Sequence, residues 1–219
     1  MSPDAEPDFA AARRELVARQ LAARGIRDPR VLEAMGRVPR ELFVPVKARR
    51  LAYSDQALPI GFGQTISQPY MVAAACELLG LVGSERVLDV GTGSGYAAAV
   101  LAELALDVVT VERIPELAER ARAALAEAGY GRVEVRVGDG SLGAPDRAPF
   151  DAIAVAAAAP RVPPALYAQL APGGRLVLPV GSRGGQRLVL VAHTPSGPVT
   201  RRSLPCRYVP LVGAEGFPG

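Results

Sequence analysis

One stretch, Val87–Tyr96, restricts the possible folds of this chain more than any other. Its first residues are mostly apolar and predict a buried strand, its glycines predict a tight turn, and the alanine-rich residues 96–104 predict a helix. A strand, a glycine loop and a helix in this order bring a ligand against bare backbone at a helix N-terminus. The alternative is a glycine-rich turn that binds no ligand.

The glycine spacing separates this loop from two common nucleotide-binding loops. Gly91, Gly93 and Gly95 form G-x-G-x-G, whereas the dinucleotide fingerprint requires glycine at the place of Tyr96. A phosphate-binding loop would end in Gly-Lys and a hydroxyl residue, and no lysine lies here. With Glu112 at the end of the next predicted strand, the pattern resembles S-adenosylmethionine-dependent methyltransferases of the Rossmann-like class.

From residue 85 onward, predicted strands and helices alternate. We therefore predict an α/β fold, a Rossmann-like doubly wound, mostly parallel sheet with helices on both faces and an N-terminal helical cap. The 219 residues suit one domain, with a cap (1–52), an active-site loop and helix (53–80) and a cofactor-binding core (81–219). The strands are expected at Arg86–Val90, Asp107–Val111, Val133–Val137, Phe150–Val155, Arg175–Val180, Arg187–Ala192 and Arg207–Val209, and the core helices at 96–104, 117–128 and 164–170.

The cap is expected to contain two helices. Apolar residues recur at helical spacing between Phe9 and Arg24, and Gly25 can end that helix. Asp28 and Pro29 have the chemistry of an N-cap and a first helical residue.

Composition excludes several classes of protein and site. No apolar stretch reaches the ~20 residues of a membrane helix, and the acidic start Met1–Glu6 does not resemble a signal peptide. Cys76 and Cys206 are far apart and suggest neither a disulfide framework nor a zinc site. The net charge of +3 comes from dispersed arginines rather than a basic stripe, so no nucleic-acid or membrane partner is expected. We expect a cytoplasmic, monomeric enzyme without a metal.

Residues 53–70 form a second unusual stretch, long and rich in hydroxyls and amides, with no clear period over most of its length. Long irregular segments in compact domains are often functional. Ser67 is predicted to be the N-cap of a helix at 69–79, which would place Thr65, Ser67 and Gln68 where backbone N–H groups favour a carboxylate. The alternative is a capping serine with no further role.

Two further acidic positions fit a nucleoside. Glu112 lies some 20 residues after the glycine loop, where a carboxylate can accept hydrogen bonds from both ribose hydroxyls. Asp139 and Gly140 follow the third strand, at the position of adenine in such folds. A surface acid or helix cap is the alternative for Glu112.

The loops after the strands limit the methyl acceptor. Residues 156–159, after the fourth strand, are all alanine and offer no Asn-Pro-Pro-Tyr type loop for amino methylation and no cysteine for cytosine methylation. Asp139, Asp146 and Asp151 lack metal-ligand spacing, and His193 is predicted to be structural. A site without base, metal or nucleophile suits an acceptor that is already an anion, such as a carboxylate held by N–H and hydroxyl groups.

From about Arg14 to Leu211, the chain resembles the protein-L-isoaspartate O-methyltransferase family. The specific pieces are residues 38–45 (VPRELFVP), 58–61 (LPIG), 63–70 (GQTISQPY), the glycine loop through Tyr96, 111–113 (VER), 138–140 (GDG), 179–181 (PVG) and 208–211 (YVPL). The glycine loop occurs in many methyltransferases, whereas the 64–69 stretch is highly specific.

The resemblance implies transfer of a methyl group from S-adenosylmethionine to the α-carboxylate of L-isoaspartyl residues in damaged proteins. The ester then collapses to a succinimide that hydrolyses partly to aspartate. It also implies Ser67 as the catalytic residue. The implied cofactor contacts are Gln64, Thr65, Ile66, Ser67, Gly91, Thr92, Gly93, Glu112, Asp139 and Gly140, and the implied substrate contacts are Thr65, Ser67, Tyr208, Val209 and Leu211.

Two positions depart from the family pattern, which usually has threonine at Ala156 and often phenylalanine at Tyr208. Two other readings stay open at this point. One is a related methyltransferase that esterifies a different carboxylate, which an assay would separate from the first. The other is a cofactor-binding regulatory protein without turnover, against which the intact Ser67, glycine loop and Glu112 argue.

Overall fold

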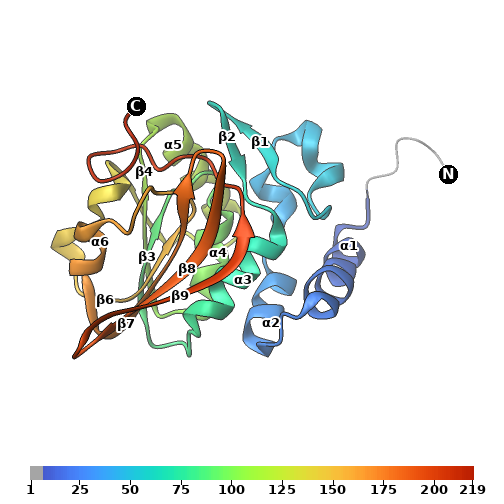
Figure 1. The fold of residues 1–219 in the computed structure, drawn as a ribbon. Coiled ribbons are helices and arrows are strands. Elements are labelled where there is room, and N and C mark those ends of the chain that lie inside the picture. The colour runs from blue at the N-terminus through green and yellow to red at the C-terminus, as the bar shows by residue number, and fades with distance from the viewer. Residues whose placement is uncertain (1–6) are drawn as a thin grey trace.

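The computed structural model describes residues 7–219, and the acidic start Met1–Glu6 lies outside them. The centre of the described part is a seven-stranded sheet in the order β5-β4-β3-β6-β7-β8-β9 (Figure 1). Strands β3 to β7 pair in parallel, and β8 and β9 are added as antiparallel hairpin strands. The strands are β3 (Arg86–Val90), β4 (Asp107–Glu112), β5 (Glu134–Val137), β6 (Phe150–Val155), β7 (Leu170–Ser182), β8 (Gly185–Thr194) and β9 (Gly197–Cys206).

Helices cover the two faces of this sheet unequally. The first core cluster joins α3 (Pro69–Leu79), α4 (Tyr96–Leu104) and α5 (Pro115–Glu127) to one face. The second cluster covers the other face, with α6 (Pro164–Ala168) beside short 3₁₀ turns at Gly140–Leu142 and Pro145–Arg147. The predicted α/β class, the mostly parallel sheet and the helices on both faces are confirmed.

The N-terminal cap packs beside α3 and α4, away from the β8–β9 hairpin (Figure 1). It contains α1 (Phe9–Glu15), a π-helical segment (Leu16–Leu21), α2 (Pro29–Arg37) and 3₁₀ turns at Ala22–Arg24, Arg40–Phe43 and Val46–Leu51. The predicted helix 9–24 thus changes geometry after Glu15. Leu16 and Leu21 are both fully buried, and the wider π turn lets side chains five residues apart share one face. Asp28 caps α2 through Arg30 N, as predicted.

The structure corrects three predictions. The last strand is not Arg207–Val209 but β9, which lacks apolar periodicity because it is a largely exposed edge strand. The N-cap of α3 is Gln68 rather than Ser67, since Gln68 adopts the extended conformation that a following proline imposes. Part of the stretch 53–70 is regular, because β1 (Leu58–Gly61) and β2 (Gln64–Ile66) form a small antiparallel hairpin.

Strand order reverses beside β3, because β4 and β5 lie on one side of it and β6 and β7 on the other. At such a switch point, the loops after neighbouring strands diverge and leave a crevice at the carboxyl ends. The glycine loop 91–95 follows β3 at this point, and residues 156–159 follow β6. The topology therefore places a ligand site at the end of β3.

Candidate active site

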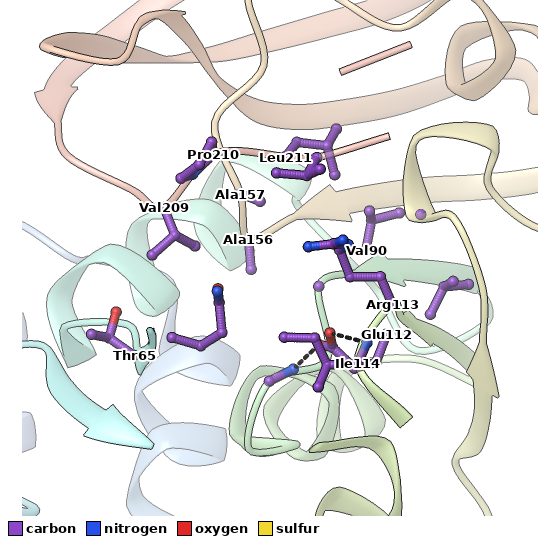
Figure 2. A pocket seen from close by; sticks show the side chains of 16 residues that line it. Thr65, Val90, Glu112, Arg113, Ile114, Ala156, Ala157, Val209, Pro210 and Leu211 are labelled. Carbon is purple, nitrogen blue, oxygen red and sulfur yellow. Dashed lines mark hydrogen bonds between the residues drawn. The ribbon is translucent and has the colours of Figure 1, made fainter. Parts of the chain in front are cut away.

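A cavity of about 650 Å³ lies at this switch point (Figure 2). Its walls come from the ends of β3, β4 and β6, from the β1–β2 hairpin and from the C-terminal segment. Figure 2 shows Thr65 and Glu112 on opposite sides, with Ala156 and Val209 above the space between them. The lining residues are Gln64, Thr65, Val90, Gly91, Gly93, Val111, Glu112, Arg113, Ile114, Gly140, Ala156, Ala157 and 209–212.

The carboxylate of Glu112 is fixed between two backbone amides at one end of this cavity. Gly93 N donates to Oε2 at 2.9 Å, and Ile114 N donates to Oε1 at 3.0 Å (Figure 2). Each oxygen keeps acceptor capacity beyond these bonds. Glu112 is therefore a rigid acceptor beside the glycine loop.

Three glycines give the loop a shape that other residues would strain. Gly91, Gly93 and Gly95 have φ values of 91°, 54° and 91°, in the region that side chains disfavour. A Cβ on Gly95 would lie 3.2 Å from Leu125 Cγ. The loop thus presents backbone to the cavity and packs α4 closely on α5.

Buried hydroxyls and a carboxyl support the loop from below. Thr92 Oγ1 lies 2.6 Å from Thr110 Oγ1, and Thr110 donates to Asp89 Oδ2 at 2.7 Å. Burial raises the pKa of Asp89 to about 6, with Glu112 adding to the rise and the Thr110 hydrogen bond opposing it. The Thr92 side chain therefore forms its hydrogen bond in the protein interior, with Thr110 on β4.

A second cavity of about 570 Å³ adjoins the first. Thr65, Ala156 and Val209 line both cavities, so the two spaces meet at these residues. The remaining lining residues are Ala57, Ser67, Gln68, Met71, Pro205, Cys206, Arg207 and Tyr208. Ser67, which is not the N-cap of α3, therefore lies in a space that opens toward the glycine loop.

Tyr208 and Ser67 both line the second cavity. Burial raises the pKa of the Tyr208 phenol, and the neighbouring Ser67 opposes that rise. Neighbouring Cys206 and Cys76 add to the rise. Tyr208 is therefore a neutral phenol at physiological pH.

The C-terminal segment closes the top of both cavities through backbone pairing. Ala158 N donates to Val209 O at 2.8 Å, and Leu211 N donates to Ala158 O at 2.7 Å. This pairing with the loop after β6 explains why residues 207–211 do not extend the sheet. It holds Val209 and Leu211 over the cavity.

The structure brings most of the predicted site residues together. Ile66 and Thr92 lie around a smaller hollow that Ser67, Gly91 and Gly93 also line. Asp139 does not line these cavities. Burial would raise its pKa, but hydrogen bonds from Ala214 N and from Ser141 lower it overall. Its neighbour Gly140 lines the first cavity, and a Cβ there would lie 2.6 Å from Val90 Cγ1.

The sequence prediction missed some residues. Ile114 and Arg113 line the first cavity directly after Glu112, and their adjacency to that acid was the available signal. Arg40 is fully buried; its Nε donates to Ala52 O and its Nη2 to Ser67 O, both at 2.8 Å. Nothing in the pattern of residues 38–45 predicted that Arg40 would be buried and bonded to the backbone of Ser67.

His193, metal ligands and membrane helices were also considered in the sequence. His193 Nδ1 lies 3.1 Å from Ala171 O, in keeping with a structural role. Among residues 7–219 there is no cluster of three or more His, Cys, Asp or Glu able to hold a metal ion. Within the same residues, none of the helices has the length and apolarity needed to span a membrane.

Comparison with known proteins identifies relatives along nearly the whole chain. The family model for protein-L-isoaspartate(D-aspartate) O-methyltransferase matches residues 11–216. The chain is 57% identical over 216 residues to protein-L-isoaspartate O-methyltransferase 1 of Rhodopseudomonas palustris, covering 98% of this chain and 88% of the relative. The resemblance therefore extends over nearly the whole of this chain.

Two solved structures share the architecture. One is a protein-L-isoaspartate O-methyltransferase, which superposes with a TM-score of 0.82 at 30% identity. The match covers 93% of this chain and 67% of the chain in that structure. The other is a candidate protein-L-isoaspartate O-methyltransferase from Plasmodium falciparum, solved with S-adenosyl-L-homocysteine. It has a TM-score of 0.80 at 24% identity, covers 91% of this chain and 98% of its own, and is evidence for the fold alone. By its sequence match and its fold, this chain belongs to the protein-L-isoaspartate(D-aspartate) O-methyltransferase family.

Proposed function

We propose that this protein transfers a methyl group from S-adenosylmethionine to the α-carboxylate of L-isoaspartyl residues in damaged proteins. The observation that carries the proposal is the junction of two cavities, one at the glycine loop and one at Ser67, through Thr65, Ala156 and Val209. A donor in the first and an acceptor in the second meet at that junction. Family membership supplies the identity of both.

The first cavity fits the cofactor in its chemistry, because it combines a fixed carboxylate, exposed loop backbone and apolar walls. We propose that Glu112 accepts hydrogen bonds from the two ribose hydroxyls and that Gly91, Thr92 and Gly93 bind the methionine part through backbone. Gly140 would adjoin the adenine, with Asp139 shaping that end by holding Ala214. Gln64, Thr65 and Ile66 would close the side toward the substrate.

When bound, S-adenosylmethionine supplies an electrophilic methyl group. The residues of this chain then have to bind, align and desolvate the acceptor. An ionised carboxylate needs no general base, because it already carries the electron pair that forms the new bond. We propose that the hydroxyls of Ser67 and Thr65 donate to the carboxylate. Tyr208, Val209 and Leu211 would wall the peptide, and apolar Ala156 would exclude water between the two cavities.

A peptide pair tests this proposal. An L-isoaspartyl peptide and its aspartyl twin are incubated with the protein and methyl-labelled S-adenosylmethionine. We expect label on the isoaspartyl peptide alone, released as methanol at mildly alkaline pH as the succinimide forms. Cofactor binding without label on either peptide would contradict the proposal and favour a different carboxylate acceptor.

We further infer a cytoplasmic monomer that acts on proteins rather than on nucleic acid or membranes. The dispersed arginines of the sequence support the absence of nucleic-acid and membrane partners. Light scattering on the purified protein would test the monomer directly, and a dimer mass would overturn it.

A further inference from the structure

Charge is distributed unevenly along this chain. Residues 152–214 contain seven arginines and no aspartate, glutamate or lysine, so all 22 acidic residues lie elsewhere. This stretch forms β7, β8 and β9 and continues into the wall of the second cavity, the orange and red part of Figure 1. The peptide-facing wall is therefore built from a purely cationic segment.

Arg207 is the arginine of this segment that reaches the second cavity. It is exposed and lines the same space as Thr65, Ser67 and Tyr208. No other residue within 7–219 forms a hydrogen bond or an ion pair with its guanidinium. By contrast, Arg187 donates to Ser203 O, and Arg183 donates to Pro218 O and stacks over Phe217. Arg207 is thus a cation without a partner at the rim.

The opposite rim does not neutralise this charge. Gln68 lines the cavity and donates from Nε2 to Asp55 at 2.6 Å. The same carboxylate also pairs with Arg24. Its negative charge is therefore already compensated by Arg24, and the rim as a whole stays positive.

We propose that Arg207 makes this enzyme prefer isoaspartyl substrates that carry an acidic side chain next to the isoaspartate. The inference rests on the proposed function and adds the charge class of the peptide. A carboxylate beside the isoaspartate would find an unpaired guanidinium at the rim of the cavity and pair with it through charge-assisted hydrogen bonds. The same guanidinium would repel a flanking lysine.

A matched peptide series tests the preference. Isoaspartyl peptides differing only in one flanking residue, Glu, Gln or Lys, are compared by kcat/KM, with the variable residue placed before or after the isoaspartate. We expect kcat/KM to fall from Glu to Gln to Lys by about fivefold at each step, for the variable residue on at least one side of the isoaspartate. The differences should shrink at high salt, because exposed charges are screened.

Variants assign the effect to one side chain. Arg207→Gln should bring the Glu and Lys peptides to within about twofold of each other, and Arg207→Glu should reverse their order. The matched control is Arg202→Gln. Arg202 pairs with Val189 across strands β8 and β9, and Val189 belongs to the second core cluster, on the sheet face that carries α6. This control should keep the wild-type order. Titration of S-adenosylmethionine binding confirms that each variant is folded.

The outcomes separate this inference from the proposed function. Equal kcat/KM for the Glu, Gln and Lys peptides would overturn the preference while leaving isoaspartyl methylation intact. A preference that survives Arg207→Gln would overturn the assignment to Arg207. If none of the isoaspartyl peptides is methylated while the cofactor is bound, the proposed function itself is contradicted, and the preference with it.

Discussion

Arg40 Nη2 donates to Ser67 O across 2.8 Å, which bonds the N-terminal cap directly to the backbone of the proposed active-site serine. The same guanidinium lies 4.6 Å from the centre of the Tyr96 ring, in the first residue of α4 after the glycine loop. Burial lowers the pKa of Arg40, and Tyr96 opposes that fall. One buried cation therefore connects the cap, the serine and the helix of the proposed cofactor loop.

Removing this cation should cost stability and turnover. Arg40→Leu leaves the carbonyls of Ala52 and Ser67 without their donor, and we expect a loss of about 3 kcal/mol in the free energy of unfolding. Turnover should fall as Ser67 loses its position. The control is Arg37→Leu, an exposed arginine whose ion pairs lie on the surface and contribute little to stability. Equal stability of the two variants in urea titrations would refute the role of Arg40.

Glu112→Ala should weaken S-adenosylmethionine binding by roughly 2–3 kcal/mol, the loss of one or two charge-assisted hydrogen bonds. Glu112→Gln should also bind weakly, because both carboxylate oxygens accept backbone N–H groups and an amide can serve only one of them. Isothermal calorimetry measures the affinities, with exposed Glu116→Ala as control. Wild-type affinity in Glu112→Ala would disprove the ribose assignment.

Ser67→Ala should lower kcat by about tenfold, corresponding to the loss of one hydrogen bond to a charged acceptor. Cofactor affinity should change less than in Glu112→Ala, because Ser67 lines the second cavity and not the first. Exposed Ser84→Ala serves as control. Unchanged turnover with an isoaspartyl peptide would leave Ser67 without a catalytic role.

Asp89 should make stability depend on pH. Its pKa is raised to about 6 in the folded protein by burial, above the ~3.9 of an unfolded aspartate. The folded state therefore binds the proton more tightly, and stability falls as pH rises from 4 to 6, by up to about 3 kcal/mol. Asp89→Asn should abolish this fall. Urea titrations at pH 4 and pH 7 measure it, and an identical pH dependence in both proteins would show that Asp89 is not its source.

The sequence predicted the centre of this fold well, because its signals there are local. The apolar run of β3, the glycines after it and the alanines of α4 each follow their own short-range preference, and all three agree. Glu112 could be placed at the cavity because the length of one strand–helix–strand unit sets its distance from the loop. Asp28 and Pro29 likewise determine the start of α2 locally.

What could not be predicted depends on contacts between distant segments. Edge strand β9 is paired on one side and mostly exposed, so its sequence has no apolar period to detect. Residues 207–211 resemble a strand, but they bond to Ala158 instead, a partner some 50 residues away. The burial of Arg40 and the inward turn of Thr92 arise only when the cap, α4 and β4 assemble.

The position of the methyl ester tests the central claim most directly. An isoaspartyl peptide that also carries a glutamate and a free C-terminus is methylated, quenched in acid to preserve the ester, and mapped by tandem mass spectrometry. We predict the methyl group on the α-carboxylate of the isoaspartyl residue alone. An ester on the glutamate or the C-terminus, or the same yield from the aspartyl twin, would contradict the account.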